Sequence, residues 1–395
     1  MEKRIYMDNA ATTSTAPEVV SAMLPFFTEY YGNPSSVYNF AQKSKMAIED
    51  AREIIADSIG AAKSNEIYFT GGGSESDNWA LKSAAFGLRD KGNHIITTKI
   101  EHHAILNTCA YLEKNGFEVT YLDVDSEGFV SLEDVENAIT EKTILISVMF
   151  ANNEIGTIEP VCEIGEIAHK HGILFHTDAV QAMCHVPINV TEMNIDLLSA
   201  SAHKFHGPKG IGFMYMKNSA KLEPFIHGGA QERARRAGTS NVPGIVGMGQ
   251  AVKLALSTLD KDTHTIINMR NYIVDRILGE IPDVTFDGPC IDANAVSAGS
   301  PAGSLKRLPS NMHFCFKDVS GDSLLIMLDM NGICASSGSA CAAGSIDPSH
   351  VLLAIGRSKG ETKGALRLSI DKDLTKEDAD YAIDALKAAV ARLRR

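Results

Sequence analysis

Short apolar runs alternate with helical periods over the first part of the chain. Seven runs are rich in β-branched or aromatic residues and are bounded by polar or glycine-containing turns, which predicts strands: EIYFT (66–70), HIITTK (94–99), FEVTYLDV (117–124), TILISVMF (143–150), ILFHTDAV (173–180), IDLLSAS (195–201) and IGFMYM (211–216). Strands separated by helices favour a mostly parallel sheet covered on both faces. We therefore expect an α/β fold with a large domain built on such a sheet.

The pattern changes near residue 250, where a long helical period begins. Beyond it, four short strand candidates are mixed with helices: DVTFD, NMHFCF, GICAS and ALRLSI. This mixture is typical of a smaller α+β domain. We place an N-terminal segment at 1–15 that joins the small domain, the large domain at 16–255 and the small domain at 256–395.

Composition and charge exclude several classes of function. Of the 395 residues, 44% are hydrophobic and 22% charged, and the formal net charge is −12, which argues against nucleic-acid or anionic-membrane partners. No apolar run resembles a signal peptide or a membrane span. Seven scattered cysteines read as reduced thiols and predict a cytoplasmic protein.

Three stretches of the large domain carry candidate chemistry. TGGGSESDN (70–78) is a glycine-rich turn that either cradles an anion at a helix N-terminus or is simply a tight turn. HTDAVQA places Asp178 at a strand end, where open α/β sheets bind ligands. SASAHKFHGPKG contains Lys204 among hydroxyl and imidazole groups, where it is either a Schiff-base lysine or one more surface lysine.

The stretch GICASSGSACAAGS (332–345) holds two cysteines in a run of small residues. Cys334 and Cys341 lack the CxxC spacing and histidine partners of a metal site, so we expect no metal. On the residues alone, the stretch is either a packed glycine-rich turn with an incidental thiol or a mobile arm, from about Ser336 to His350, that carries a reactive sulfur. A last stretch, QERARRAGTSN (231–241), is either a solvated charge run or an anion contact across an interface.

Eight motifs then occur in a familiar order: MDNAATT, GGGSESDN, EHHA, NNEIG, HTDAVQ, SAHKFHGPKG, RRAGT and SSGSAC. Over essentially the whole chain the sequence resembles the NifS/IscS-type cysteine desulfurases. These are pyridoxal-phosphate (PLP) enzymes of fold type I, whose large domain carries a mostly parallel seven-stranded sheet. The resemblance implies a transferase that converts L-cysteine to L-alanine and serves iron–sulfur cluster or thiolation pathways.

The resemblance also implies a role for individual residues. Lys204 would hold PLP covalently and move the substrate's Cα proton, Asp178 would pair with the pyridine nitrogen, and Gln181 would bind the phenolic oxygen. His102 would stack on the ring and assist proton transfer, whereas His103 would be a neighbour without a role.

The remaining implied residues bind the cofactor's phosphate or the substrate, or carry the sulfur. Gly73, Ser74, Ser201 and His203 would contact the phosphate, with Thr239 reaching the site of the other subunit in a homodimer. Asn153 and Arg367 would lie near the substrate carboxylate. Cys341 would take the sulfur as a persulfide and pass it to an acceptor protein, while Cys334 would be a small buried residue of its strand.

Two departures from the family pattern stand out. Ser74 occupies a position where the family often has threonine. After RLSI comes DKDLT, where many relatives have a Gly-Arg pair. Three other functions stay open: a selenocysteine lyase, another class-V PLP aminotransferase or lyase, and a sulfur-trafficking protein without catalysis.

Overall fold

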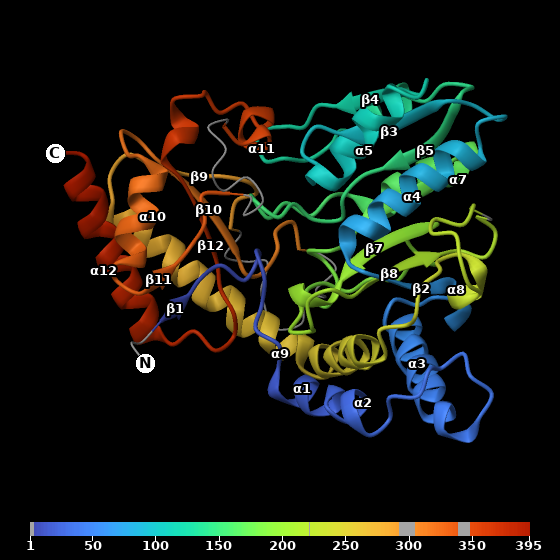
Figure 1. Ribbon diagram of the computed structural model, residues 1–395. Helices are drawn as coiled ribbons and strands as arrows, with labels where there is room; N and C mark the ends of the chain where they lie inside the picture. The colour runs from blue at the N-terminus through green and yellow to red at the C-terminus, as the bar shows by residue number, and fades with distance from the viewer. Residues whose placement is uncertain (1–3, 221, 292–304, 339–347) are drawn as a thin grey trace.

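A seven-stranded sheet forms the centre of the large domain (Figure 1). The computed structural model describes residues 4–220, 222–291, 305–338 and 348–395. Within them, β8 runs antiparallel to both of its neighbours and the other six strands are mutually parallel. In spatial order the strands are β2 (Ile67–Thr70), β8 (Gly212–Met216), β7 (Leu197–Ser201), β6 (Leu174–Asp178), β5 (Thr143–Ser147), β3 (His94–Thr98) and β4 (Glu118–Leu122).

Alternating residues of these strands are buried on the two faces of the sheet. Phe69 and Ile146 belong to one apolar core, and Tyr68 and Leu145 belong to the other. Burial on both faces explains why the strands read as nearly continuous apolar runs. The helices that accompany the sheet are α1 (Pro17–Met23), α2 (Pro25–Thr28), α3 (Asn39–Ser58), α4 (Gly73–Gly87), α5 (His103–Glu113), α6 (Leu132–Asn137), α7 (Val161–His171) and α8 (Gln231–Ala234).

The small domain surrounds a second core. Its three-stranded antiparallel sheet has the order β12 (Ala365–Ser369), β10 (Asn311–Phe316) and β9 (Val284–Phe286), so three strand candidates are confirmed there. The fourth, β11 (Ile333–Cys334), pairs in parallel with β1 (Ile5–Tyr6), which attaches the N-terminal segment to this domain. The helices are α10 (Gly321–Asp329), α11 (His350–Ala354) and α12 (Lys376–Leu393).

One helix, α9 (Val242–Glu280), links the two domains (Figure 1). Its first part contributes Ile245 and Val252 to the large core, and its second part contributes Ile273 and Ile277 to the small core. By length and composition α9 is the one described helix that meets the requirements of a membrane span, and these two cores account for most of its buried apolar residues. The predicted domain boundary at 255/256 falls inside this continuous helix.

Substitution within α9 tests how strongly the second core depends on this helix. Ile273 is fully buried, so Ile273→Ala should lower the free energy of unfolding by about 2–5 kcal/mol through lost contacts and a residual cavity. Leu278 on the same helix is 44% exposed, and Leu278→Ala should cost less than about 0.5 kcal/mol. Urea denaturation of both variants measures the difference. Equal shifts would contradict this assignment of the buried face.

Candidate active site

Side chains from both domains line a cavity of about 190 Å³ beside the carboxyl ends of β6 and β7. Open α/β sheets place ligands at this edge. The cavity brings together most of the residues predicted from the sequence: Gly73, Ser74, His102, Asn153, Asp178, Gln181, Ser201, His203, Lys204 and Arg367.

Lys204 ends a short 3₁₀ turn, Ala202–Lys204, that directly follows β7. Its Nζ atom donates to the carbonyl oxygens of Ala10 at 2.6 Å and Ala11 at 2.9 Å. Gln181 Nε2 donates to the same Ala10 oxygen at 3.0 Å. The N-terminal segment therefore forms part of the site and holds the lysine in place.

Asp178 is the last residue of β6 and is 5% exposed. Its Oδ1 atom accepts the backbone N–H of Val180 at 2.9 Å. Burial raises the pKa of Asp178, and the positive charges of His102 and Lys204 oppose this rise. A cationic N–H group placed against Asp178 would favour its ionised form in the same way.

His102 occupies the N-cap position of α5. Its Nδ1 atom accepts the N–H of Ala104 at 3.1 Å, so in the neutral ring the proton sits on Nε2. The ring of His103 lies 4.8 Å from that of His350, centroid to centroid. Capping thus fixes which His102 nitrogen is available as a donor.

The start of α4 forms the floor of an anion site. A Cβ atom on Gly73 would lie 2.5 Å from a methyl group of Val180, so only glycine fits there. Ser201 and His203 line the same cavity, and His203 Nδ1 hydrogen-bonds Thr12 Oγ1 at 3.1 Å. Burial, with Lys204 and a second nearby lysine, lowers the pKa of His203 to about 4, which leaves a neutral imidazole. Helix N–H groups and hydroxyls of this kind suit a phosphate group.

Arg367 enters the cavity from β12 and is 1% exposed. Its Nη2 atom pairs with Asp8 Oδ1 at 2.9 Å, and Nη1 donates to the backbone oxygen of Asn153 at 2.9 Å. Its Nε atom has no hydrogen-bond partner among the described residues. The guanidinium is thus held at the junction of three chain segments with one donor still available.

Sequence reasoning missed Asp77, which lines the same cavity. It lies one helical turn after Gly73 and is 1% exposed. Its Oδ1 atom accepts no hydrogen bond from the described residues and lies 3.8 Å from His176 Nε2. Burial and the nearby Asp178 carboxylate raise its pKa well above the usual value. Its i+4 spacing from Gly73 was the available signal.

Two predicted residues are not placed in this cavity. Thr239 lies in a separate hollow with Glu232 and Arg236. Cys341 lies outside the described residues, as does most of the stretch from Ser336 to His350 that carries it.

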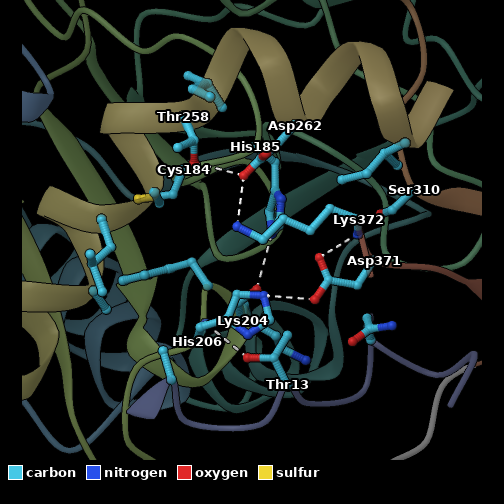
Figure 2. Close-up of a pocket in the computed structure, with 18 of the residues that line it drawn as sticks. Thr13, Cys184, His185, Lys204, His206, Thr258, Asp262, Ser310, Asp371 and Lys372 are labelled. Carbon is cyan, nitrogen blue, oxygen red and sulfur yellow. Dashed lines mark hydrogen bonds and ion pairs between the residues drawn. The ribbon is translucent and has the colours of Figure 1, made fainter. Parts of the chain in front are cut away.

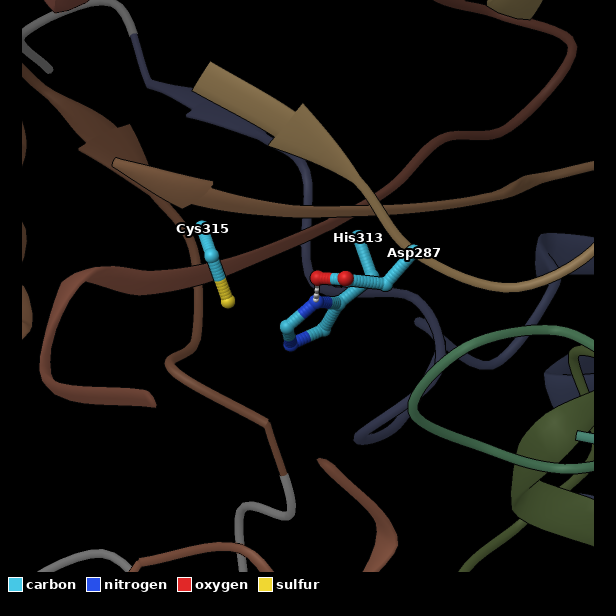
Figure 3. A group of neighbouring side chains, drawn as sticks. All are labelled: Asp287, His313 and Cys315. Atoms are coloured by element: carbon cyan, nitrogen blue, oxygen red, sulfur yellow. Dashed lines mark hydrogen bonds and ion pairs between the residues drawn. The ribbon is translucent and has the colours of Figure 1, made fainter. Parts of the chain in front are cut away.

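Outside the candidate active site, three buried side chains form a cluster with the composition of a metal site: Asp287, His313 and Cys315 (Figure 3). His313 Nδ1 hydrogen-bonds Asp287 Oδ2 at 2.8 Å, and Arg357 Nε donates to Asp287 Oδ1 at 2.6 Å. Burial raises the pKa of the Cys315 thiol. Because a guanidinium already supplies the positive charge beside Asp287, the cluster is explained as an arginine–carboxylate–imidazole chain.

Comparison with known proteins agrees with the geometry of the site. The family model "Aminotransferase class-V" matches residues 5–382. The chain is 54% identical to cysteine desulfurase IscS of Clostridium botulinum (strain Hall) over 394 residues, which cover 100% of this chain and 96% of that protein.

Two solved structures are similar over nearly the whole chain. A NifS-like protein has a TM-score of 0.89 and 36% identity, covering 99% of this chain and 100% of that one. SspA in complex with cysteine has a TM-score of 0.79 and 38% identity, covering 94% and 99%. The predicted fold class and the resemblance to NifS/IscS-type proteins are thereby confirmed, and the chain belongs to the class-V aminotransferase family.

Proposed function

We propose that this chain is a PLP-dependent cysteine desulfurase that converts L-cysteine to L-alanine. The observation that carries the proposal is the meeting of Lys204, Asp178 and Arg367 in one cavity. An amine nucleophile, a buried carboxylate and an arginine are the groups needed for a Schiff base, a pyridinium and an amino-acid carboxylate. The IscS relatives and the cysteine complex of SspA support this substrate.

The described residues fit PLP. Lys204 would hold its aldehyde carbon and Asp178 its ring nitrogen, with Gln181 and His102 around the ring. Gly73, Ser74, Ser201 and His203 would hold its phosphate. When bound, the cofactor supplies an electron sink for charge developing at the substrate's Cα.

The protein's own groups would move the proton and orient the substrate. Lys204 Nζ must leave the carbonyls of Ala10 and Ala11 before it can react, and those oxygens then become a second resting position for the amine. His102 presents an Nε2 donor toward the cavity side of α5. Arg367 and Asn153 would position the substrate carboxylate.

We further propose that Cys341 is the sulfur acceptor. Its thiolate would attack the substrate sulfur, so that an S–S bond forms, the Cβ–S bond breaks, and alanine leaves with a hydrogen in place of the thiol. An unperturbed thiol is only a few per cent ionised at neutral pH, so a proton acceptor would assist. His102 would fill this role only after its own Nε2 proton has been donated, because Nδ1 accepts the N–H of Ala104. The persulfide would then pass to an acceptor protein.

The proposal includes a cytoplasmic homodimer. Thr239 lies outside the cavity of its own chain, and it would contact PLP in the partner. The six cysteines among the described residues are free thiols, as suits a reducing compartment.

Substitution of Cys341 separates desulfuration from other PLP chemistry. Cys341→Ser should keep the absorbance of the bound cofactor but lose alanine formation from L-cysteine, because the sulfur has no acceptor. Mass spectrometry of the wild-type Cys341 peptide should show one added sulfur atom after incubation with L-cysteine. Full turnover by the variant would favour a selenocysteine lyase or another class-V lyase.

Substitution of Arg367 tests recognition of the carboxylate. Arg367→Lys keeps the charge but loses the planar fork, so KM for L-cysteine should rise about 10- to 100-fold, the loss of one hydrogen bond to a charged group. Arg357→Lys is the control, because Arg357 is an arginine of the same domain that pairs with Asp287 outside the cavity. Steady-state alanine assays give both values, and an equal rise in both variants would contradict the assignment.

Substitution of Asp77 tests whether its buried carboxylate lowers the stability of the protein at neutral pH. The folded pKa of Asp77 is raised, so wild-type stability falls as pH rises from the usual value of 3.8 through that raised pKa. Asp77→Asn should therefore raise the thermal midpoint of the cofactor-free protein at neutral pH. This gain should shrink as pH falls toward 3.8. Calorimetry across pH measures it, and a variant less stable at every pH would show that the carboxylate is satisfied.

A further inference from the structure

A second and larger cavity, of about 400 Å³, lies behind Lys204 at the junction of the two domains (Figure 2). Ala10, Gln181 and Lys204 line both this cavity and the candidate active site. Its lining includes the loop after Lys204 and residues that follow β12. The contacts across this cavity therefore join the lysine loop to the strand that carries Arg367.

His206, two residues after Lys204, makes the central contact (Figure 2). Its Nε2 atom lies 3.1 Å from Asp371 Oδ2, and its Nδ1 atom lies 3.1 Å from the backbone oxygen of Ser14. A carbonyl oxygen can only accept, and so can an ionised carboxylate. Both ring nitrogens must therefore donate, which requires a doubly protonated imidazolium.

The backbone of His206 is held equally firmly. Its φ of 62° lies in the left-handed region, which is uncommon for a residue with a side chain. Its N–H donates to Thr13 Oγ1 at 2.8 Å, and its carbonyl oxygen accepts the N–H of Ala16 at 3.1 Å. The N-terminal segment thus fixes the conformation in which the ring reaches Asp371.

Asp371 lies on the small-domain side of this contact. It follows Arg367 by four residues, in the DKDLT segment that departs from the family pattern. Two residues before Asp371, at the end of β12, the backbone oxygen of Ser369 accepts a hydrogen bond from Asn9 Nδ2 of the N-terminal segment at 2.9 Å. Three chain segments therefore meet at one ion pair.

We propose that protonated His206 is a positioning residue that sets the distance between Lys204 and Arg367 through its ion pair with Asp371. This inference rests on the proposed function, in which Lys204 would act at the substrate's Cα and Arg367 would hold its carboxylate. It goes beyond that function because neither His206 nor Asp371 lines the candidate active site.

The charged surroundings agree with this role. The hydrogen bond to Asp371 raises the pKa of His206, and burial opposes it. Burial pushes the pKa of Asp371 upward, but the hydrogen bond and charge of His206 bring it below its usual value. The other titratable groups around the cavity are Glu18, His185, Lys204, Asp262, Lys372 and Asp373.

The pH window of the contact follows from these directions. A raised histidine pKa gives an interaction that is complete below 6.5 and is lost as pH rises through the folded value. Because the pKa of Asp371 is lowered, the contribution of this carboxylate to the ion pair is complete above pH 3.8 and is lost only at lower pH. The contact is therefore complete between pH 3.8 and 6.5 and is lost as pH rises through the raised pKa of His206.

The test compares His206→Gln and Asp371→Asn with the control Asp262→Asn. Asp262 forms a neighbouring ion pair with Lys372 at 2.8 Å in the same cavity, and it lies on α9 rather than on the lysine loop. At pH 6.5 both test variants should raise KM for L-cysteine about fivefold, as expected for a partly screened charged hydrogen bond. The ratio of variant to wild-type KM should fall toward one at alkaline pH, and the control should match wild type throughout.

A second measurement keeps the proposal independent of turnover. In wild-type holoenzyme labelled with ¹⁵N-histidine, the His206 signal is the one missing from His206→Gln, and both of its nitrogens should stay protonated above pH 6.5. A neutral His206 ring at that pH, or a KM ratio that does not change with pH, would overturn the proposal. Absence of alanine formation in wild type would instead reject the proposed function and leave the NMR titration to decide the state of His206.

Discussion

The ion pair between the buried Arg367 and the partly exposed Asp8 is the constraint on which the site depends. It joins the last strand of the small domain to the N-terminal segment, and the same guanidinium reaches the large domain through the Asn153 carbonyl. Removing one partner of a buried pair leaves an uncompensated charge, at a cost of about 3–5 kcal/mol. The relative position of the two domains is therefore fixed by a charge that the proposed reaction also uses.

The buried acids around the cavity are a second constraint on the site. Asp77, Glu101 and Asp178 are all buried, and burial raises the pKa of each. The charge of Lys204 opposes the rise at Asp178. A ligand with a cationic ring nitrogen beside Asp178 would likewise favour the ionised form of this carboxylate.

The sequence predicted the strands well because parallel strands buried on both faces are continuous apolar runs. The family resemblance placed Lys204, Asp178 and Arg367 in one site, and the structure brings them together. The resemblance did not reveal Asp77 or the Lys204 contacts with the Ala10 and Ala11 carbonyls. The neighbours of a helical residue such as Asp77 are known only once the helix is packed in the fold. Which backbone oxygen a side chain will contact does not depend on residue type, so a sequence pattern cannot show it. Periodicity also could not show that α9 continues unbroken through both cores.

The N-terminal segment has a consequence for the order of assembly during synthesis. It leaves the ribosome first, yet β1 pairs with β11 and Asn9 binds Ser369, near the other end of the chain. Contacts so distant in sequence form late, because a long loop must close first. The large sheet can form while translation continues, whereas Lys204 gains its carbonyl partners only after nearly the whole chain has emerged. A product truncated before β11 would thus contain Lys204 without an anchored N-terminal segment to orient it.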